Sequence, residues 1–171
     1  MTGPGGSAIE RLIAALRLDL HVYQQVSTER TATPQACLIV FLCGVCNGFG
    51  LSPRLGEAAM LAGVASAVVG WFLWALVILL VARLLGHHRG GRSLLRTLGF
   101  ANAPGVLLAL GGVPFVGAVV RVVVVIWLMA TTALAAQAVY DVSRRRAVVI
   151  ALGGFTTYMV LGLISAVLLA F

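Results

Sequence analysis

Several uninterrupted apolar runs in the chain are long enough to cross a lipid bilayer. A helix needs about 18 to 20 mainly apolar residues to span the hydrocarbon core, and residues 34–51, 57–85, 114–139 and 147–171 reach that length. Only 10% of the residues are charged and 61% are hydrophobic, which is far from the usage of soluble domains. Because a helix pairs its backbone polar groups within itself, these runs predict an all-α, polytopic membrane protein.

A further apolar run, residues 94–112, carries residues that disturb a helix. These residues are Asn102, Pro104, Gly105, Gly111 and Gly112. Proline removes a backbone N–H and clashes with the preceding turn. Such a break is tolerated at membrane depth where neighbouring helices satisfy the freed backbone groups. We therefore predict a central third span surrounded by the other four, with Arg96 snorkelling at its inner edge.

Residues 1–33 precede the five-helix region, residues 34–171, and form a separate N-terminal segment. A single amphipathic helix is predicted over residues 8–26, because apolar side chains recur there at helical spacing. These side chains are Ile9, Leu12, Ile13, Leu16, Leu20 and Tyr23. Cations flank the apolar stripe, as in a helix that lies on an anionic leaflet. Docking on the inner ends of the spans, or binding to a partner, is an equally open alternative.

The arginines determine the predicted orientation of the five spans. The chain has 12 basic residues, all of them arginine, and a net charge of +7. Ten arginines fall on one side of the membrane and Arg54 alone on the other, while Arg121 lies inside the fourth span. Since basic residues in short loops mark the cytoplasmic side, we expect a cytoplasmic N-terminus and an external C-terminus. The arginines adjoin membrane spans, which favours lipid headgroups over nucleic acid as their partners.

Small residues on the first two spans predict close contacts between helices. Gly44 and Gly48 stand four residues apart in the first span, and Ser66 and Gly70 do so in the second. Faces of this kind let two helix backbones approach closely in a membrane. We therefore expect both pairs to pack against other helices.

Sulfur and aromatic side chains within the spans are expected to pack the bundle. Cys43 and Cys46 share one helix face inside an apolar span, where a reactive thiolate is not favoured. Three tryptophans lie near mid-span rather than in the interfacial belts. They are Trp71, Trp74 and Trp127. No cofactor is expected, although a lipid, quinone or pigment lodged against these rings is an open alternative.

Arg121 is the strongest candidate for a functional side chain within the spans. It lies roughly 10 Å of helix beyond Pro114, and an ionisable residue at membrane depth is a functional hypothesis by default. Snorkelling to the outer interface is the alternative that we favour. The partners available to it are Asn102 and the backbone carbonyls near Gly111.

The inner loops offer little further chemistry. Asp141 stands close in sequence to Arg144 and Arg146, and we expect these three residues to hold the last inner loop in place. His87 and His88 lie in a glycine-rich loop and are a weak metal signal. No catalytic triad, carboxylate pair, phosphate loop or metal cage can be assembled. We therefore predict no catalytic, cofactor or metal site, and no enzyme activity.

Motifs spread over residues 16–165 follow a recognisable order. The most specific are residues 95–105 and 113–117. Supporting segments are residues 16–26, 31–36, 70–74, 126–127 and 138–147. This pattern resembles the bacterial branch of the Yip-domain family, although Gln137 stands where a basic residue is common. The resemblance implies five membrane helices, a cytoplasmic N-terminus, residence in a bacterial inner membrane and no catalytic activity. Rab binding by eukaryotic members is not carried over.

Three functions follow from these features. The first is a non-enzymatic protein that acts through helix–helix association, as an accessory or assembly subunit of a larger inner-membrane complex. Its partner would be another integral membrane protein or a second copy of the chain, within the surrounding lipid. The second is a small-solute or ion pathway around the broken third helix, which is disfavoured because few polar residues line the spans. The third is membrane shaping or a trafficking-like role through the N-terminal helix.

Overall fold

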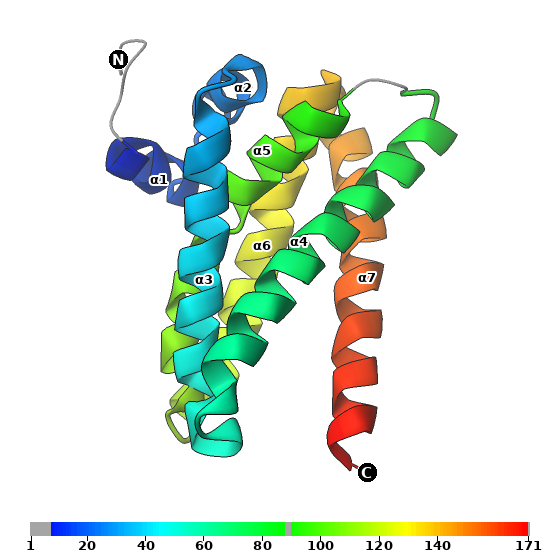
Figure 1. Ribbon diagram of the computed structural model, residues 1–171. Helices are drawn as coiled ribbons and strands as arrows, with labels where there is room; N and C mark the ends of the chain where they lie inside the picture. The colour runs from blue at the N-terminus through cyan, green and yellow to red at the C-terminus, as the bar shows by residue number, and fades with distance from the viewer. Residues whose placement is uncertain (1–7, 88–89, 171) are drawn as a thin grey trace.

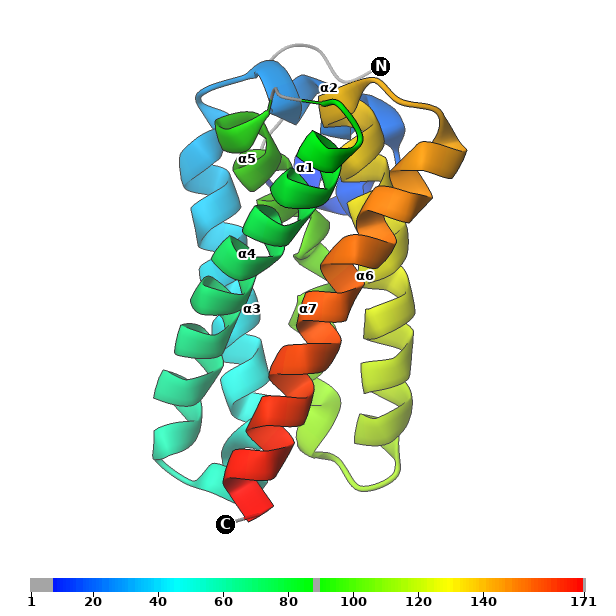
Figure 2. The same cartoon turned by 90° about the vertical axis from the view of Figure 1, so that its right-hand side faces the viewer.

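The computed structural model describes the backbone of residues 8–87 and 90–170, and the side chains of residues 9–87, 90–156, 159 and 160. Within this part the chain is helical and contains no strand (Figure 1). The elements in chain order are α1 (Ala8–Leu16), α2 (Leu20–Thr28), α3 (Ala32–Leu55), α4 (Ala58–Leu84), α5 (Gly91–Ala101), the 3₁₀ helix η1 (Ala103–Gly112), α6 (Val116–Tyr140) and α7 (Arg144–Ala170). The long helices run up and down along one direction, with α1 and α2 at one end of the bundle (Figures 1 and 2).

Three of the described helices, α3, α4 and α6, are long and apolar enough to cross a membrane. The pair formed by α5 and η1 meets the same standard and is bent by 43°, which brings the number to as many as four. The α7 helix has 27 residues, roughly 40 Å of length, but many of its side chains lie outside the described part. An all-α membrane protein is therefore confirmed, and the fifth span stays a prediction.

The bent segment α5–η1 occupies the middle of the bundle. Both of its halves pack against α3 on one side and against α6 on the other. The α4 helix packs on α3 and α5, and α7 closes the arrangement by packing on α4 and α6. Figure 2 shows α4 and α7 crossing in front of the α5–η1 segment. The helices α3, α4 and α6 thus pack on the bent segment, and α7 packs on two helices that hold it.

The α3 and α4 helices meet through glycines, which allow their backbones to approach closely. Gly44 and Gly48 of α3 are buried, and a Cβ at Gly63 of α4 would lie 2.5 Å from the carbonyl oxygen of Gly44 and would collide with the backbone of Gly48. Of the predicted α4 face, Ser66 contacts α3 by accepting a hydrogen bond of 3.4 Å from the Asn47 amide, whereas Gly70 does not take part in the close glycine contact. A Cβ at Gly70 would meet no atom within 4 Å, so the contact lies almost two turns earlier in α4, at Gly63.

The α3 helix continues beyond the end of the predicted run at residue 51, through Pro53 to Leu55. A proline in a helix leaves the carbonyl four residues before it without its usual N–H partner. Here that carbonyl belongs to Phe49, and it accepts a hydrogen bond of 2.8 Å from the Ser52 hydroxyl. The helix then ends at Gly56, where φ is 55°.

The single helix predicted over residues 8–26 is wrong, because the chain forms two short helices there. The break lies at Leu18, whose φ is 62°. Asp19 then caps α2 by accepting a hydrogen bond of 3.0 Å from the backbone N–H of His21. In α2 the side chains of Val22 and Val26 are buried against the bundle. The structure therefore favours docking of this helix on the ends of the spans.

Replacement of Gly63 by valine tests the glycine contact. Two added methyl groups and a Cβ would overlap the α3 backbone at Gly48, so we expect the free energy of unfolding in detergent to fall by about 1–3 kcal/mol or more. The measurement is thermal or denaturant unfolding of the purified protein. Gly70→Val is the control, since that position is open, and it should change stability little. Equal losses in both variants would contradict the packing.

Candidate functional site

The bend in the middle of the bundle is built around Asn102. Its side-chain amide donates to the Leu98 carbonyl at 2.8 Å, and its backbone N–H donates to the same oxygen at 3.0 Å. The Asn102 carbonyl accepts the backbone N–H of Gly105 at 2.8 Å, which closes the first turn of η1. Pro104 is fully buried in that first turn, where a backbone N–H has no intrahelical partner and its loss costs little.

Side chains from both neighbouring helices complete the hydrogen bonding at this bend. The buried Thr131 hydroxyl of α6 contacts the Ala101 carbonyl at 2.8 Å, while it also lies within bonding distance of carbonyls in its own helix. From α3, the Cys43 thiol donates to the Asn102 carbonyl at 3.2 Å. Gly105 allows this approach, because a Cβ there would lie only 3.2 Å from the Cβ of Cys43. The neighbours therefore bond two carbonyls at the break, those of Ala101 and Asn102.

The second half of the bent segment is a 3₁₀ helix of 10 residues, much longer than is usual. Its far end is pressed against α3: a Cβ at Gly50 would collide with the Leu108 carbonyl, and one at Gly112 would lie 2.8 Å from Pro53. Its other side is open, with Leu110 47% exposed. The prediction of a segment surrounded by protein thus holds for α5 and fails for the outward side of η1.

Arg121 binds the backbone at the end of η1. Its Nη2 donates to the Gly111 carbonyl at 3.1 Å, and the side chain is half-buried. Carbonyls in the last turn of a helix lack intrahelical donors, so the guanidinium supplies one. Of the two partners expected for this cation, the structure selects the glycine carbonyl rather than Asn102. The arrangement assigns Arg121 a positioning role at the η1–α6 turn.

The prediction that Arg96 snorkels at the inner edge is wrong. The side chain is only 9% exposed, and its Nη2 donates to the Ser27 carbonyl at 2.6 Å. The Ser93 hydroxyl donates to the same oxygen, also at 2.6 Å. Ser27 lies in the last turn of α2, where a cation stabilises the unpaired carbonyls and the negative end of the helix dipole. Two side chains of α5 thus hold α2 on the bundle.

Trp127 of α6 reaches the end of α1. Its indole N–H donates to the Leu16 carbonyl at 3.2 Å. One residue earlier, the Ala15 carbonyl accepts the Tyr23 hydroxyl at 3.1 Å, and burial raises the pKa of Tyr23 so that the hydroxyl stays protonated. The last turn of α1 is therefore bonded to α2 and to the middle of α6. This role differs from the expectation that Trp127 packs the bundle core.

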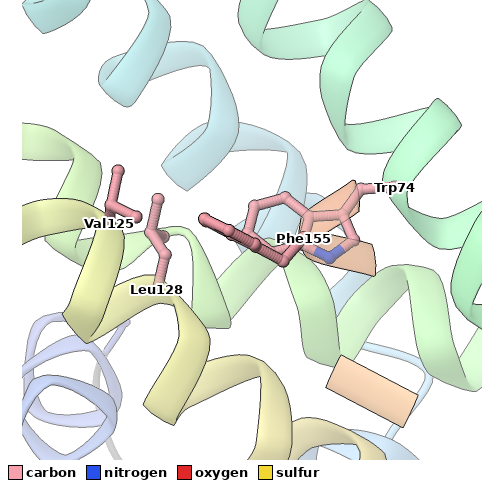
Figure 3. A pocket seen from close by; sticks show the side chains of 4 residues that line it. All are labelled: Trp74, Val125, Leu128 and Phe155. Atoms are coloured by element: carbon pink, nitrogen blue, oxygen red, sulfur yellow. The ribbon is translucent and has the colours of Figure 1, made fainter. Parts of the chain in front are cut away.

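A small hollow between α4, α6 and α7 lies beside one of the tryptophans (Figure 3). Its lining is Trp74, Val125, Leu128 and Phe155. In Figure 3, the two α6 side chains lie on one side and the two aromatic rings on the other. The lining is apolar but the space is too narrow to admit a water molecule. A lipid, quinone or pigment at this place would require the helices to separate.

The last inner loop is held by backbone geometry. Asp141 ends α6 in the left-handed conformation, with φ of 50°, and its N–H donates to the Gln137 carbonyl at 3.0 Å. Among the residues that the structure describes, no ion pair joins Asp141 to Arg144 or Arg146. Both arginines are exposed at the start of α7, where the helix dipole disfavours cations. The contribution of Asp141 to this loop thus comes from its backbone, and a joint role with Arg144 and Arg146 stays a prediction.

Metal binding gains no support from the described residues. Where the structure describes the chain, no group of three or more His, Cys, Asp and Glu side chains is placed to hold a metal ion. The adjacent histidines of the glycine-rich loop are only partly covered, because His88 and the neighbouring Arg89 lie outside the described residues. Of the cysteines, Cys43 is buried and Cys46 is partly buried.

Thr131 and Gly63 are structural residues that the sequence analysis missed. Thr131 and Thr132 are the only hydroxyl side chains in the apolar run 114–139. Isolated hydroxyls in an apolar span are typical of interhelical hydrogen bonds, so this signal was present in the sequence. Gly63 has no such signal, since it lies in a run rich in small residues.

Comparison with protein families gives one match. The family model described as the Yip1 domain matches residues 21–167, which is most of the chain. No curated protein and no solved structure matches the chain. The matched range begins in α2 and includes the whole of the bend.

Replacing Thr131 by valine should uncover the Ala101 carbonyl within the bundle. An unpaired buried backbone group costs about 1–3 kcal/mol, so we expect a loss of stability of that size in detergent or nanodiscs. Thr131→Ser keeps the hydroxyl and should retain most of the stability. The measurement is thermal unfolding of the three proteins in parallel, and a valine variant as stable as the parent would refute the role of this bond.

Proposed function

The chain belongs to the Yip1-domain family, and from this premise we propose that it is a non-enzymatic, integral membrane protein that works by binding other membrane helices. We place it as an accessory or assembly subunit of a larger complex in a bacterial inner membrane. Its partner is another integral membrane protein or a second copy of the chain. The proposal rests chiefly on one open surface of α4.

That surface is the small-residue face of Ser66 and Gly70. The other small face of α4, at Gly63, is filled by α3, whereas a Cβ at Gly70 would meet nothing within 4 Å. Ser66 accepts a hydrogen bond of 3.4 Å from the Asn47 amide of α3, so the open part of this face is formed by Gly70 and Val69, and Val69 is 54% exposed. Small residues are the positions at which membrane helices approach one another most closely. The face is therefore suited to a helix that this chain does not itself supply.

The polar side chains near the bend support association over transport. Asn102, Thr131 and Arg121 all donate to backbone carbonyls of the bent segment. In transporters with broken helices, the freed polar groups at the break face a substrate or an ion. Here these donors are used to hold the broken segment in its place, which favours a structural role for the bend over a pathway.

The distribution of charge supports the proposed orientation. The arginines described at the end of the bundle that holds α2 are Arg30, Arg83, Arg92, Arg96, Arg144, Arg145 and Arg146. Arg54, by contrast, lies at the α3–α4 turn at the opposite end. Basic residues concentrate on the cytoplasmic side of short loops. We therefore place α1 and α2 on the cytoplasmic side, with five spans and the end of α7 outside.

Replacement of Gly70 by leucine tests the association surface. Leucine fills the open face, so we expect the bound partner, or the self-associated form, to be reduced roughly tenfold while the fold is unchanged. The measurement is quantitative mass spectrometry of the protein purified gently from its native membrane, together with its mass in nanodiscs. Ala118→Leu, an exposed small residue of α6, is the matched control. Unchanged association in Gly70→Leu would contradict the proposal.

Replacement of Arg121 by leucine separates association from transport. The variant loses the bond to the Gly111 carbonyl, so we expect lower thermal stability but unchanged partner binding. If the bend were a pathway, the parent protein in vesicles would pass potassium ions or protons, and the variant would not. Ion flux that depends on Arg121 would therefore overturn the proposed function.

A further inference from the structure

The short helix α1 lies further along the bundle than α2. In both views it lies below α2, beside the upper part of the long helices, rather than beyond their ends (Figures 1 and 2). The sequence predicted a helix resting on a membrane surface, or docked on the ends of the spans. Its observed depth in the bundle indicates a third position.

The depth of α1 follows from its bond to α6. The Leu16 carbonyl, in the last turn of α1, accepts the indole N–H of Trp127. From Trp127 the α6 helix continues to Tyr140 at the arginine-rich end, a distance of roughly 20 Å along the helix axis. Since α6 is a candidate membrane span, a group in hydrogen-bond contact with its middle lies well below its end.

One side of α1 is held firmly by protein. Arg11 is only 7% exposed, and it forms an ion pair of 2.8 Å with Glu29 and a longer contact of 3.4 Å to Gln35 in the first turns of α3. A hydrogen bond from the Thr31 hydroxyl, followed by the bond and charge of Arg11, lowers the pKa of Glu29, which therefore stays ionised at neutral pH. Ala15, one turn after Arg11, is fully buried. This side cannot face lipid.

The other side of α1 is exposed and divided into two parts. Ile9 and Ile13 are 68% and 45% exposed and stand one turn apart. Glu10 and Arg17 are exposed beside them, on the same outward side. An apolar strip next to a charged strip is the pattern of a helix at the boundary between acyl chains and headgroups.

An exposed apolar side chain of a candidate span also lies near α1. Leu38 of α3 lies one turn beyond Gln35, which contacts Arg11, and it is 53% exposed on the outside of a candidate span. We propose that α1 is embedded in the leaflet at the arginine-rich end, with Ile9 and Ile13 against acyl chains and with Glu10 and Arg17 among the headgroups. The occupant of this face is lipid, and the ion pair of Arg11 with Glu29 fixes the helix in place. This inference does not depend on the proposed protein partner.

Photo-crosslinking from α1 tests the embedding. We would place benzoylphenylalanine at Ile13 in the full chain, reconstitute it in vesicles of phosphatidylcholine and phosphatidylglycerol, irradiate, and measure lipid adducts by mass spectrometry. Leu38 is the control for a lipid-facing site, and His21, exposed on α2, is the control for a headgroup or aqueous site. We expect the Ile13 yield to approach that of Leu38 and to exceed that of His21 by roughly fivefold or more.

A second position guards against a local defect at Ile13. The same probe at Ile9, which is the more exposed of the two, should give the same result. Yields at both positions equal to the His21 value would overturn the inference and would leave α1 in water. Adducts to a second copy of the chain in place of lipid would also overturn it, because they would show that protein covers this face.

Discussion

The structure depends on how a broken backbone is satisfied inside an apolar bundle. In lipid no water replaces a missing hydrogen bond, so each freed carbonyl needs a donor from the protein. At the bend between α5 and η1 the hydroxyl of Thr131 bonds the Ala101 carbonyl, while the amide of Asn102 and the thiol of Cys43 add second bonds to the Leu98 and Asn102 carbonyls. These donors come from α6, from the bent segment itself and from α3. The break thereby ties the bent segment to both of its neighbours.

The same requirement explains the elements that surround the bend. The Phe49 carbonyl, which Pro53 leaves without a backbone donor, accepts a hydrogen bond from the Ser52 hydroxyl. At the end of η1 the Gly111 carbonyl accepts a hydrogen bond from Arg121. In the last turns of α1 and α2, backbone carbonyls accept hydrogen bonds from Trp127 and Arg96, respectively. Polar side chains at membrane depth are usually taken as functional candidates, but Asn102, Thr131 and Arg121 are donors to backbone carbonyls. The surfaces available to lipid or to other proteins are therefore the exposed faces of the helices.

Much of the fold could be predicted, because apolar length and helix-breaking residues act locally. The runs 57–85 and 114–139 correspond closely to α4 and α6, and Asn102 with Pro104 located the bend. Partners distant in sequence could not be predicted. Gly63 and Gly70 are equally small, and only the rotation of α4 against α3 decides which one is buried. The break at Leu18 also had no local signal, since a leucine with positive φ is unusual.

The most direct test of this account is hydrogen–deuterium exchange over residues 98–112 in nanodiscs. If the bend is a closed joint, the amides around Asn102, including the Gly105 N–H that bonds to its carbonyl, should exchange slowly, like those in the middle of α4. Loss of this protection in Thr131→Val would show that the hydrogen bond from α6 keeps the bend closed. Rapid exchange in the parent protein, equal to that of an exposed loop, would contradict the account, because it would show that water reaches the break.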